Sequence, residues 1–279
     1  MRVAAFQFDV RRGDVAANLV AVERGLRQAA GRGIELVVLP EMWPTSFVAE
    51  GDAADDGPDA WQRATDVAVE RVGVLSRELD LVVAGSAFGI GRAGEPPRNR
   101  LSVFARGERV LVYDKLHLFS PTAEAESFSG GDALPPTVAL PTIALQTAKL
   151  AGVICYDLRF GPALRAPFLA EAEILVVPAQ WPASRAAHWR ALVCGRAAEL
   201  QAFVVAANRT GRDLVGRRRL ALEFAGNSLV TGPDGSVLAE GHGADGLVEA
   251  ELDFASLRAL RRAVPVRRDE RPDVYGLPG

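Results

Sequence analysis

The stretch Ile34-Glu35-Leu36-Val37-Val38-Leu39 decides the fold class of this chain. Its final run of Val37-Val38-Leu39 is apolar on both faces, as expected for a parallel strand that helices cover on both sides. Residues 3–8 form a similar short apolar run, and between the two lies a helical pattern over residues 15–30, with apolar side chains recurring on one face. The three segments together predict a β-α-β unit.

The same alternation continues after this unit. A helical pattern over residues 61–79 leads into Leu81-Val82-Val83-Ala84-Gly85, a further strand that is apolar on both faces. Residues 100–104 and 109–113 then flank a short polar turn, which predicts a hairpin with antiparallel pairing. We therefore expect parallel and antiparallel strands in one mixed sheet.

The second half of the chain predicts another β-α-β arrangement. The expected elements, in chain order, are strands at residues 143–146 and 150–155, a helix beginning near Pro162, a strand at 174–177, a helix at 184–200, a strand at 203–207 and a hairpin at Pro233-Asp234-Gly235. Two such halves predict an α/β fold in which two mixed sheets pack face to face, with helices outside. Because no linker rich in Pro, Gly and Ser separates the halves, we expect one domain over residues 1–279.

Composition narrows the class of function. The 279 residues are 49% hydrophobic and 24% charged, which is typical of a globular protein with a full core. The net charge is -3 and the basic residues are scattered, so we expect no nucleic-acid partner. No run of about 18 apolar residues is present, and the N-terminal apolar run is too short for a signal peptide. These features predict a cytoplasmic protein with no membrane partner that acts on a small molecule.

The chain has two cysteines, Cys155 and Cys194. Two are too few for a disulfide framework, and their spacing is not that of a zinc site. The histidines, His117, His188 and His242, show no metal-ligand spacing either. We therefore expect no metal ion and no cofactor, and we expect Cys194, which lies inside a predicted helix, to have a packing role.

Three chemically active side chains, Glu41, Lys115 and Cys155, lie just beyond the ends of predicted strands. In α/β sheets, ligands bind beyond the carboxyl ends of the strands, so these three side chains can converge. An ordinary thiol, with a pKa of about 8.5, is only a few per cent thiolate near neutral pH and needs roughly 2 kcal/mol of activation. Glu41 can provide this activation as a base, and Lys115 can provide it as a cation.

Lys115 itself needs support, because burial alone can lower the pKa of a lysine by about 3 to 5 units. Each carboxylate about 4 Å away favours the charged form by on the order of 4 kcal/mol at an effective dielectric constant of about 20. Two carboxylates would therefore keep Lys115 protonated. Glu124 is the candidate for the second carboxylate, with Glu126 a rival in the same loop.

Three segments together resemble a known family: Leu39-Pro40-Glu41-Met42, Tyr113-Asp114-Lys115-Leu116-His117-Leu118-Phe119 and Ile154-Cys155-Tyr156-Asp157-Leu158-Arg159-Phe160. They are similar, in the same order, to the glutamate, lysine and cysteine motifs of the nitrilase superfamily of carbon-nitrogen hydrolases. Further similar positions are Glu124, seven residues ahead of Gly131-Asp132, and the segments Trp181-Pro182, His188-Trp189, Asn208-Arg209 and Gly226-Asn227-Ser228. The resemblance covers nearly the whole chain, implies an αββα sandwich and favours Glu124 over Glu126.

By this resemblance, Cys155 attacks the carbon of a small amide, while Glu41 takes the thiol proton and returns it to the leaving ammonia. Lys115 and the backbone N–H of Tyr156 stabilise the tetrahedral oxyanion. Glu124 holds Lys115 and helps to place the water that cleaves the thioester. These are the roles of the family's Glu-Lys-Cys triad, and they disfavour a Cys-His protease, in which an imidazole is the base.

Substrate contacts are expected from Trp181, Arg185 and His188, which follow the strand predicted at residues 174–177. An apolar wall and a guanidinium suit a short amide that carries a carboxylate. Two alternatives stay open at this point. Arg185 can be an ordinary exposed helix residue, and His188 can make a structural hydrogen bond.

Residues 181–189 are most similar to the omega-amidase branch, so the leading prediction is hydrolysis of the terminal amide of α-keto acid amides such as 2-oxoglutaramate. The first alternative is an amidohydrolase for N-carbamoyl amino acids or amines. The second, from another class, is a catalytically inactive binding or assembly module. The family also implies a homodimer or a higher homo-oligomer. Gly161-Pro162 and a basic insertion at residues 212–222 depart from the family pattern and could reshape the rim of the pocket.

Overall fold

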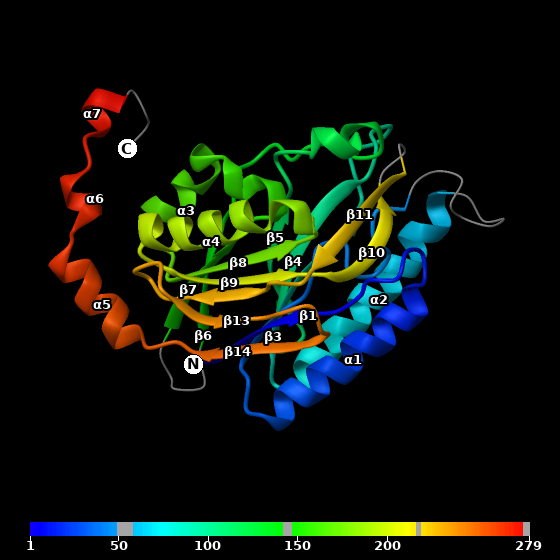
Figure 1. Cartoon of the computed structure of the whole chain (residues 1–279), viewed down its shortest axis with the longest axis horizontal. Coiled ribbons are helices and arrows are strands. Elements are labelled where there is room, and N and C mark those ends of the chain that lie inside the picture. Colours follow the sequence, from blue (N-terminus) through cyan, green and yellow to red (C-terminus); the bar gives the residue numbers. More distant parts are fainter. Residues whose placement is uncertain (49–57, 142–146, 216–218, 276–279) are drawn as a thin grey trace.

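The computed structural model describes residues 1–48, 58–141, 147–215 and 219–275. Within these residues, two six-stranded sheets pack face to face, and helices cover the outer side of each (Figure 1). Both sheets combine parallel and antiparallel strand pairs. The layers therefore follow the order helix, sheet, sheet, helix, in agreement with the α/β sandwich that the sequence predicts.

The first sheet has the strand order β14-β1-β2-β3-β4-β5. Its strands are β1 (Arg2–Gln7), β2 (Leu36–Val38), β3 (Val82–Gly89), β4 (Arg98–Ala105), β5 (Glu108–Asp114) and β14 (Gly246–Glu251). Strands β1, β2 and β3 pair in parallel, whereas β4, β5 and β14 pair antiparallel with their neighbours. Helices α1 (Val15–Gly31) and α2 (Pro58–Glu78) run side by side along this sheet (Figure 1), where the sequence predicts helices.

The second sheet has the strand order β13-β12-β9-β8-β7-β6. Its strands are β6 (Thr137–Pro141), β7 (Thr147–Gly152), β8 (Ile174–Ala179), β9 (Phe203–Asn208), β12 (Leu229–Thr231) and β13 (Val237–Glu240). The central strands β7, β8 and β9 are parallel. Helices α3 (Arg165–Leu169) and α4 (Ala186–Leu200) cover its outer face (Figure 1).

The apolar pattern of the sequence explains both interfaces. In α1, Val22 and Leu26 are fully buried and pack with Phe6 and Val37 on the outer face of the first sheet. Asp14 caps this helix, because its carboxylate accepts a hydrogen bond from the amide of Ala17 at 3.0 Å. Strands that are apolar on both faces therefore have one face under the helices and the other against the opposite sheet.

The core between the sheets draws on both halves of the chain. Val38 and Leu101 of the first sheet belong to the same buried cluster as Leu150, Val176 and Val205 of the second. The carboxyl ends of β2, β7 and β8 consequently lie close to one another. This arrangement places the segments that follow these strands at a common edge.

Several details differ from the sequence prediction. The strand predicted at residues 143–146 lies outside the described residues, and the strand before it is β6. The chain at Pro162 first forms a 3-10 turn, η4 (Gly161–Leu164), and becomes α-helical only at Arg165. The described residues of the basic insertion predicted at residues 212–222 lie in or next to a separate two-stranded sheet of β10 (Thr210–Val215) and β11 (Leu220–Ala225).

The described C-terminal residues form α5 (Phe254–Ala263), α6 (Val266–Asp269) and α7 (Pro272–Tyr275), which extend along one side of the sandwich (Figure 1). Arg261 and Arg267 fasten this segment, because their guanidinium groups donate to backbone carbonyls of Ala172, Gln201 and Leu200. Among the described residues, no helix has both the length and the apolar character that a bilayer-crossing segment requires.

A pair of glycine substitutions tests the packing between the sheets. A Cβ atom on Gly152, at the end of β7, would collide with Leu101 of the opposite sheet and lie 2.8 Å from Val176 Cγ2. We expect Gly152→Ala to lower the free energy of unfolding by about 1–3 kcal/mol through overpacking. Gly195→Ala in α4 is the control, because nothing lies within 4 Å of its Cβ position. The control should stabilise the protein by about 0.5–1 kcal/mol in denaturant titrations. Equal effects of the two substitutions would contradict this description.

Candidate active site

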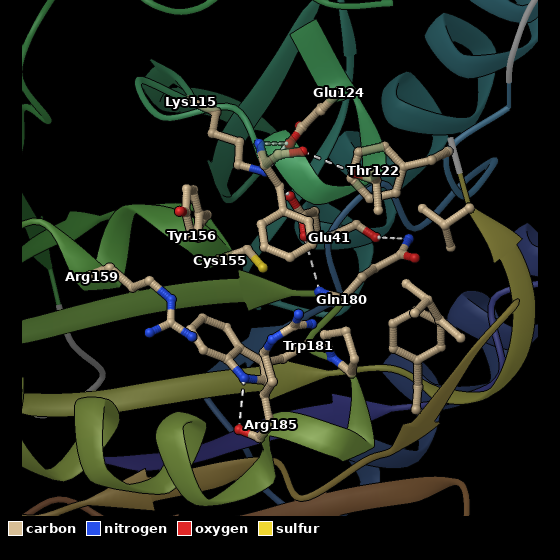
Figure 2. Close-up of a pocket in the computed structure, with 16 residues that line it drawn as sticks. Glu41, Lys115, Thr122, Glu124, Cys155, Tyr156, Arg159, Gln180, Trp181 and Arg185 are labelled. Carbon is tan, nitrogen blue, oxygen red and sulfur yellow. Dashed lines mark hydrogen bonds and ion pairs between the residues drawn. The ribbon is translucent and has the colours of Figure 1, made fainter. Parts of the chain in front are cut away.

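Four segments bring charged and nucleophilic groups to the edge between the two sheets. Glu41 follows β2, Lys115 follows β5, Glu124 opens the short 3-10 helix η2 (Glu124–Glu126), and Cys155 opens the 3-10 helix η3 (Cys155–Arg159). Figure 2 shows these side chains around one pocket, with the sulfur of Cys155 beside Glu41. The structure thus brings together the four residues that the sequence predicts as catalytic.

Lys115 lies between the two glutamates. Its Nζ is 2.8 Å from Glu41 Oε1 and 2.8 Å from Glu124 Oε2, and each of the three side chains is only 1% exposed. Lys115 Nζ also donates to Glu124 Oε1 at 2.9 Å. Glu126 is exposed to solvent, so the second carboxylate beside Lys115 is that of Glu124.

Electrostatics keep this lysine charged. Burial favours the neutral amine and lowers the pKa of Lys115, but the charges of Glu124 and Glu41 outweigh burial, and the net pKa is raised. Burial is also the largest influence on Glu124, and together with the charge of Glu41 it raises the pKa of Glu124 against the opposing effect of Lys115. The site therefore contains one ammonium and two carboxylates that compete for it.

The surroundings of Cys155 disfavour its thiolate form. Burial raises the pKa of Cys155 well above its ordinary value, the charge of Glu41 raises it further, and Lys115 opposes the shift without reversing it. From the sequence, either a base or a cation could activate this thiol. In this environment the cation alone is insufficient, so the thiol needs a base that removes its proton as it reacts.

The backbone around the site is strained. Cys155 has a positive φ of 45°, and so do Met42, next to Glu41, with 47°, and Ala123, next to Glu124, with 56°. Left-handed backbone is unfavourable for side chains other than glycine, and such residues gather at functional sites. The strain turns Cys155 sharply out of the end of its strand and aims its side chain into the pocket.

Asp157 fixes this turn. Its fully buried carboxylate accepts hydrogen bonds from the Ile154 amide at 3.2 Å, the Tyr113 hydroxyl at 2.8 Å and the His117 amide at 2.9 Å. It therefore joins the segment that carries Cys155 to the segment that carries Lys115. His117 also contacts Asp157 through Nδ1 at 2.8 Å, so this imidazole has a structural partner.

The empty space of the pocket, including the part that is open to solvent, is about 450 Å³. Besides Glu41, Lys115, Glu124 and Cys155, its lining residues are Phe47, Phe119, Thr122, Tyr156, Arg159, Gln180, Trp181, Pro182, Arg185, Val215, Leu222 and Phe224. Trp181 and Arg185 line it as the sequence predicts. His188 is exposed, is not among the lining residues, and contacts Arg159 through Nδ1 at 3.3 Å, so the structure does not bring it to the pocket.

Residues 2–262 match the family of carbon-nitrogen hydrolases. The chain belongs to this family. It is 32% identical over 278 residues to the 2-oxoglutaramate amidase of Bacillus subtilis (strain 168), with 98% of each chain covered. It is 31% identical over 258 residues to the omega-amidase YafV of Escherichia coli (strain K12), covering 92% of this chain and 91% of that protein.

Solved structures agree with this membership. A crystal structure of an amidase from Nesterenkonia sp. has a TM-score of 0.78 and 25% identity, covering 97% of this chain and 96% of that one. A cysteine-to-alanine variant of the Nesterenkonia AN1 amidase, described as a member of the nitrilase superfamily, has a TM-score of 0.79 and 25% identity, covering 97% of each chain. The predicted nitrilase-like sandwich and the predicted superfamily are confirmed.

Two side chains of this carbon-nitrogen hydrolase were missed in the sequence. Gln180 directly follows β8 and holds Glu41 through two hydrogen bonds. Its backbone N–H donates to Glu41 Oε2 at 3.0 Å, and its side-chain Nε2 donates to the backbone carbonyl of Glu41 at 2.8 Å. Asn99 donates from Nδ2 to Glu41 Oε1 at 2.8 Å. A polar residue at the end of an apolar strand was a usable signal for Gln180, whereas Asn99 had no such signal.

The small sheet of β10 and β11, which includes described residues of the predicted basic insertion, lines one side of the pocket. Val215 of β10, and Leu222 and Phe224 of β11, form an apolar wall. The buried guanidinium of Arg209 anchors this sheet to the body, with bonds of 2.9 Å to Asp9 and 2.9 Å to Asp213. Within the described residues, no cluster of His, Cys, Asp and Glu has the arrangement of a metal site.

The two lysines of the chain provide a matched test of the site. Lys115→Met leaves two buried carboxylates without their cation, and we expect it to lower the free energy of unfolding by about 3–5 kcal/mol. Lys149→Met removes an exposed pair with Glu171 at 3.6 Å and should cost less than about 1 kcal/mol. Denaturant unfolding of both variants measures the difference. Comparable losses in the two variants would mean that Lys115 is not the buried cation described here.

Proposed function

We propose that this carbon-nitrogen hydrolase is an amidase of the omega-amidase type that cleaves the terminal amide of small α-keto acid amides such as 2-oxoglutaramate. The observation that carries the substrate class is a pair of guanidinium groups, Arg159 and Arg185, in the wall of the pocket that contains Cys155. Neither forms an ion pair with a residue in the described part of the chain. A substrate carboxylate suits both groups.

Aromatic side chains orient the two guanidinium groups. Trp181 and Phe119 flank the two arginines, with the Arg159 guanidinium 4.9 Å from the Trp181 ring and that of Arg185 5.7 Å from the Phe119 ring. Stacking of this kind fixes the orientation of a guanidinium and leaves its edge free for a planar carboxylate. The relatives named 2-oxoglutaramate amidase and omega-amidase support the same class.

The proposed mechanism uses the groups already described. Glu41 takes the proton of the Cys155 thiol while the sulfur forms a bond to the amide carbon, and the carbonyl oxygen becomes an oxyanion. Lys115 and the backbone N–H of Tyr156 stabilise that oxyanion. Tyr156 suits this role because it lies in the first turn of η3, where amides have no partner within the helix.

Collapse of this intermediate expels the amine nitrogen, which takes the proton from Glu41 and leaves as ammonia. Cys155 then carries the acyl group as a thioester. Water attacks the thioester with Glu41 as base, and the acid product and the free thiol are released. Glu124 keeps Lys115 protonated in place and helps to position the water.

An N-carbamoyl amino acid is the second candidate, since it also carries a carboxylate. A relative at 27% identity is the N-carbamoylputrescine amidase of Arabidopsis thaliana, with 94% of this chain and 90% of that protein covered. A cationic carbamoyl amine fits less well, because two unpaired guanidinium groups in the pocket would repel it. A catalytically inactive binding module is disfavoured by the close packing of Glu41 and Lys115 beside Cys155.

An assay of released ammonia tests the proposal. Purified protein is given 2-oxoglutaramate, an N-carbamoyl amino acid, a neutral amide such as butyramide, and a nitrile, with Cys155→Ala as the blank. We expect the highest kcat/KM with 2-oxoglutaramate and no activity in the blank. Release of carbon dioxide with ammonia identifies the carbamoyl activity, and activity that survives in Cys155→Ala rules out the proposed mechanism.

Arginine substitutions test the substrate class. Arg159→Met and Arg185→Met keep the apolar stem but remove the charge, so each should raise KM for 2-oxoglutaramate roughly 10-fold or more and change KM for butyramide little. Arg190→Met is the control, because Arg190 is half-exposed on α4 and pairs with Glu240 outside the pocket. Equal effects on the charged and the neutral amide would argue against a carboxylate site.

The predicted single domain, the cytoplasmic location and the homo-oligomeric state stay predictions. Light scattering of the purified protein measures its mass in solution. A mass of twice the chain or more is expected for the homodimer or higher homo-oligomer that the family resemblance implies.

A further inference from the structure

Asn99 is a buried amide at the centre of the site. It lies near the start of β4 and is fully buried. Its Nδ2 donates to Glu41 Oε1 at 2.8 Å and, through a longer bond of 3.4 Å, to Glu124 Oε1. Its backbone carbonyl accepts a hydrogen bond from the Lys115 amide at 2.9 Å. One residue that does not line the pocket therefore contacts three of the charged residues of the site.

The orientation of this amide is fixed by its partners. If the side chain were flipped, Oδ1 would face the oxygens of Glu41 and Glu124, and acceptors would oppose acceptors. With Nδ2 toward the carboxylates, Oδ1 is buried and has no hydrogen-bond partner in the described part of the chain. A buried acceptor without a partner is unfavourable and needs an explanation. The explanation is that this orientation allows Nδ2 to donate its hydrogen bond to Glu41.

The two carboxylate oxygens of Glu41 are not equivalent. Each oxygen can accept about two hydrogen bonds in the plane of the group. Oε1 accepts from Asn99 Nδ2 at 2.8 Å and from Lys115 Nζ at 2.8 Å, so its acceptor positions are filled. Oε2 accepts only from the Gln180 amide at 3.0 Å among the described bonds, which leaves one position open.

We propose that Asn99 is a positioning residue that, together with Lys115, occupies Glu41 Oε1, so that Oε2 is the atom that receives the proton of Cys155. In this step the S–H bond breaks, its electron pair forms the bond from sulfur to the amide carbon, and the proton forms an O–H bond on Oε2. The same proton leaves with the amine nitrogen as ammonia. This inference rests on the proposed function and assigns its base to one atom.

A neutral donor suits this position. A second cation beside Glu41 would stabilise its charge so strongly that the carboxylate would become a poor base, whereas an amide donates a hydrogen bond without adding charge. The charged and titratable groups that face Glu41 are Lys115, Glu124 and Cys155, with Arg209 behind Gln180 at 3.2 Å from Gln180 Oε1. A substitution of Asn99 leaves these four groups unchanged, so a change in the pH profile can be assigned to the lost hydrogen bond.

The hydrogen bond that Asn99 donates determines in which direction the pH profile of the site moves when Asn99 is removed. The hydrogen bond from Asn99 Nδ2 is worth more to a carboxylate acceptor than to a neutral one. Its removal should move the acidic limb of the pH profile upward, by about one pH unit for a hydrogen bond to a charged group. A residue with only a packing role would change the amount of folded protein but would not move this limb.

The test measures the alkylation of Cys155 by iodoacetamide against pH, with quantification by peptide mass spectrometry. Alkylation of Cys194 in the same samples is the internal reference. The proteins are the unsubstituted chain, Asn99→Ala, Asn99→Ser and Asn18→Ala. Asn18 is a matched control, because it is a buried asparagine whose side chain, within the described part of the chain, bonds to backbone groups of Arg11 and Pro44 and does not line the pocket.

We expect the acidic limb of Cys155 alkylation to move up by about one pH unit in Asn99→Ala and by less in Asn99→Ser, whose hydroxyl can still donate. Asn18→Ala should lower the thermal midpoint and leave the limb unchanged. With 2-oxoglutaramate, kcat should fall about 10-fold or more in Asn99→Ala, while KM changes little.

An unchanged limb in a folded Asn99 variant overturns the inference, even if activity is reduced. If Asn99→Ala does not fold, Asn99→Ser decides the question by the same criterion. The proposed substrate class can fail separately. If the unsubstituted protein does not hydrolyse 2-oxoglutaramate, Cys155 alkylation still reports on Glu41, with Glu41→Gln showing which part of the profile depends on that carboxylate.

Discussion

The ammonium of Lys115, buried between Glu41 and Glu124, is the interaction on which the rest of the site depends. A lone buried lysine would lose its proton, and a lone pair of buried carboxylates would retain one. At contact distance and an effective dielectric constant of about 20, each carboxylate stabilises the ammonium by on the order of 4 kcal/mol. The three groups therefore stabilise one another as a set beside the thiol.

The groups beside the thiol shape its chemistry. Burial disfavours the thiolate of Cys155, and the neighbouring charge of Glu41 disfavours it further, so both raise the pKa of Cys155. The protein accordingly keeps a neutral nucleophile and a charged base together until a substrate carbonyl is present. Charge then moves from Glu41 toward the carbonyl oxygen, where Lys115 can stabilise it. Preorganised charges of this kind cost no reorganisation at the moment of reaction.

The fold supplies the precision that this arrangement requires. Glu41, Lys115 and Cys155 follow strands from both sheets, so their separation is set by the packing of one sheet on the other. The left-handed backbone at Cys155 lies beside the local hydrogen bond from the Ile154 amide to Asp157, and the segment of Glu41 is held by the backbone amide of the distant Gln180. Rigid elements thus hold the reacting groups, while the smaller β10-β11 sheet contributes only to the wall of the pocket.

The sequence was sufficient to predict the fold class and the meeting of four side chains, Glu41, Lys115, Glu124 and Cys155, because each belongs to an apolar strand end or a recognisable motif. It was insufficient for Asn99 and Asp157. Their importance comes from hydrogen bonds that form only when distant segments meet in a particular register, and a single sequence does not record that register. His188 was expected at the pocket because it follows the strand predicted at residues 174–177, with a structural hydrogen bond as the open alternative. The first turn of α4 directs it to the surface, where it contacts Arg159.

Trapping the acyl-enzyme tests whether Cys155 is the nucleophile. The protein is quenched with acid during turnover of 2-oxoglutaramate and of butyramide, and the peptides are mapped by mass spectrometry. We expect the peptide containing Cys155 to carry the acyl part of each hydrolysed amide as a thioester. Turnover with the acyl group on another residue, or with no acyl group on Cys155 at any time before steady state, would contradict this role of Cys155.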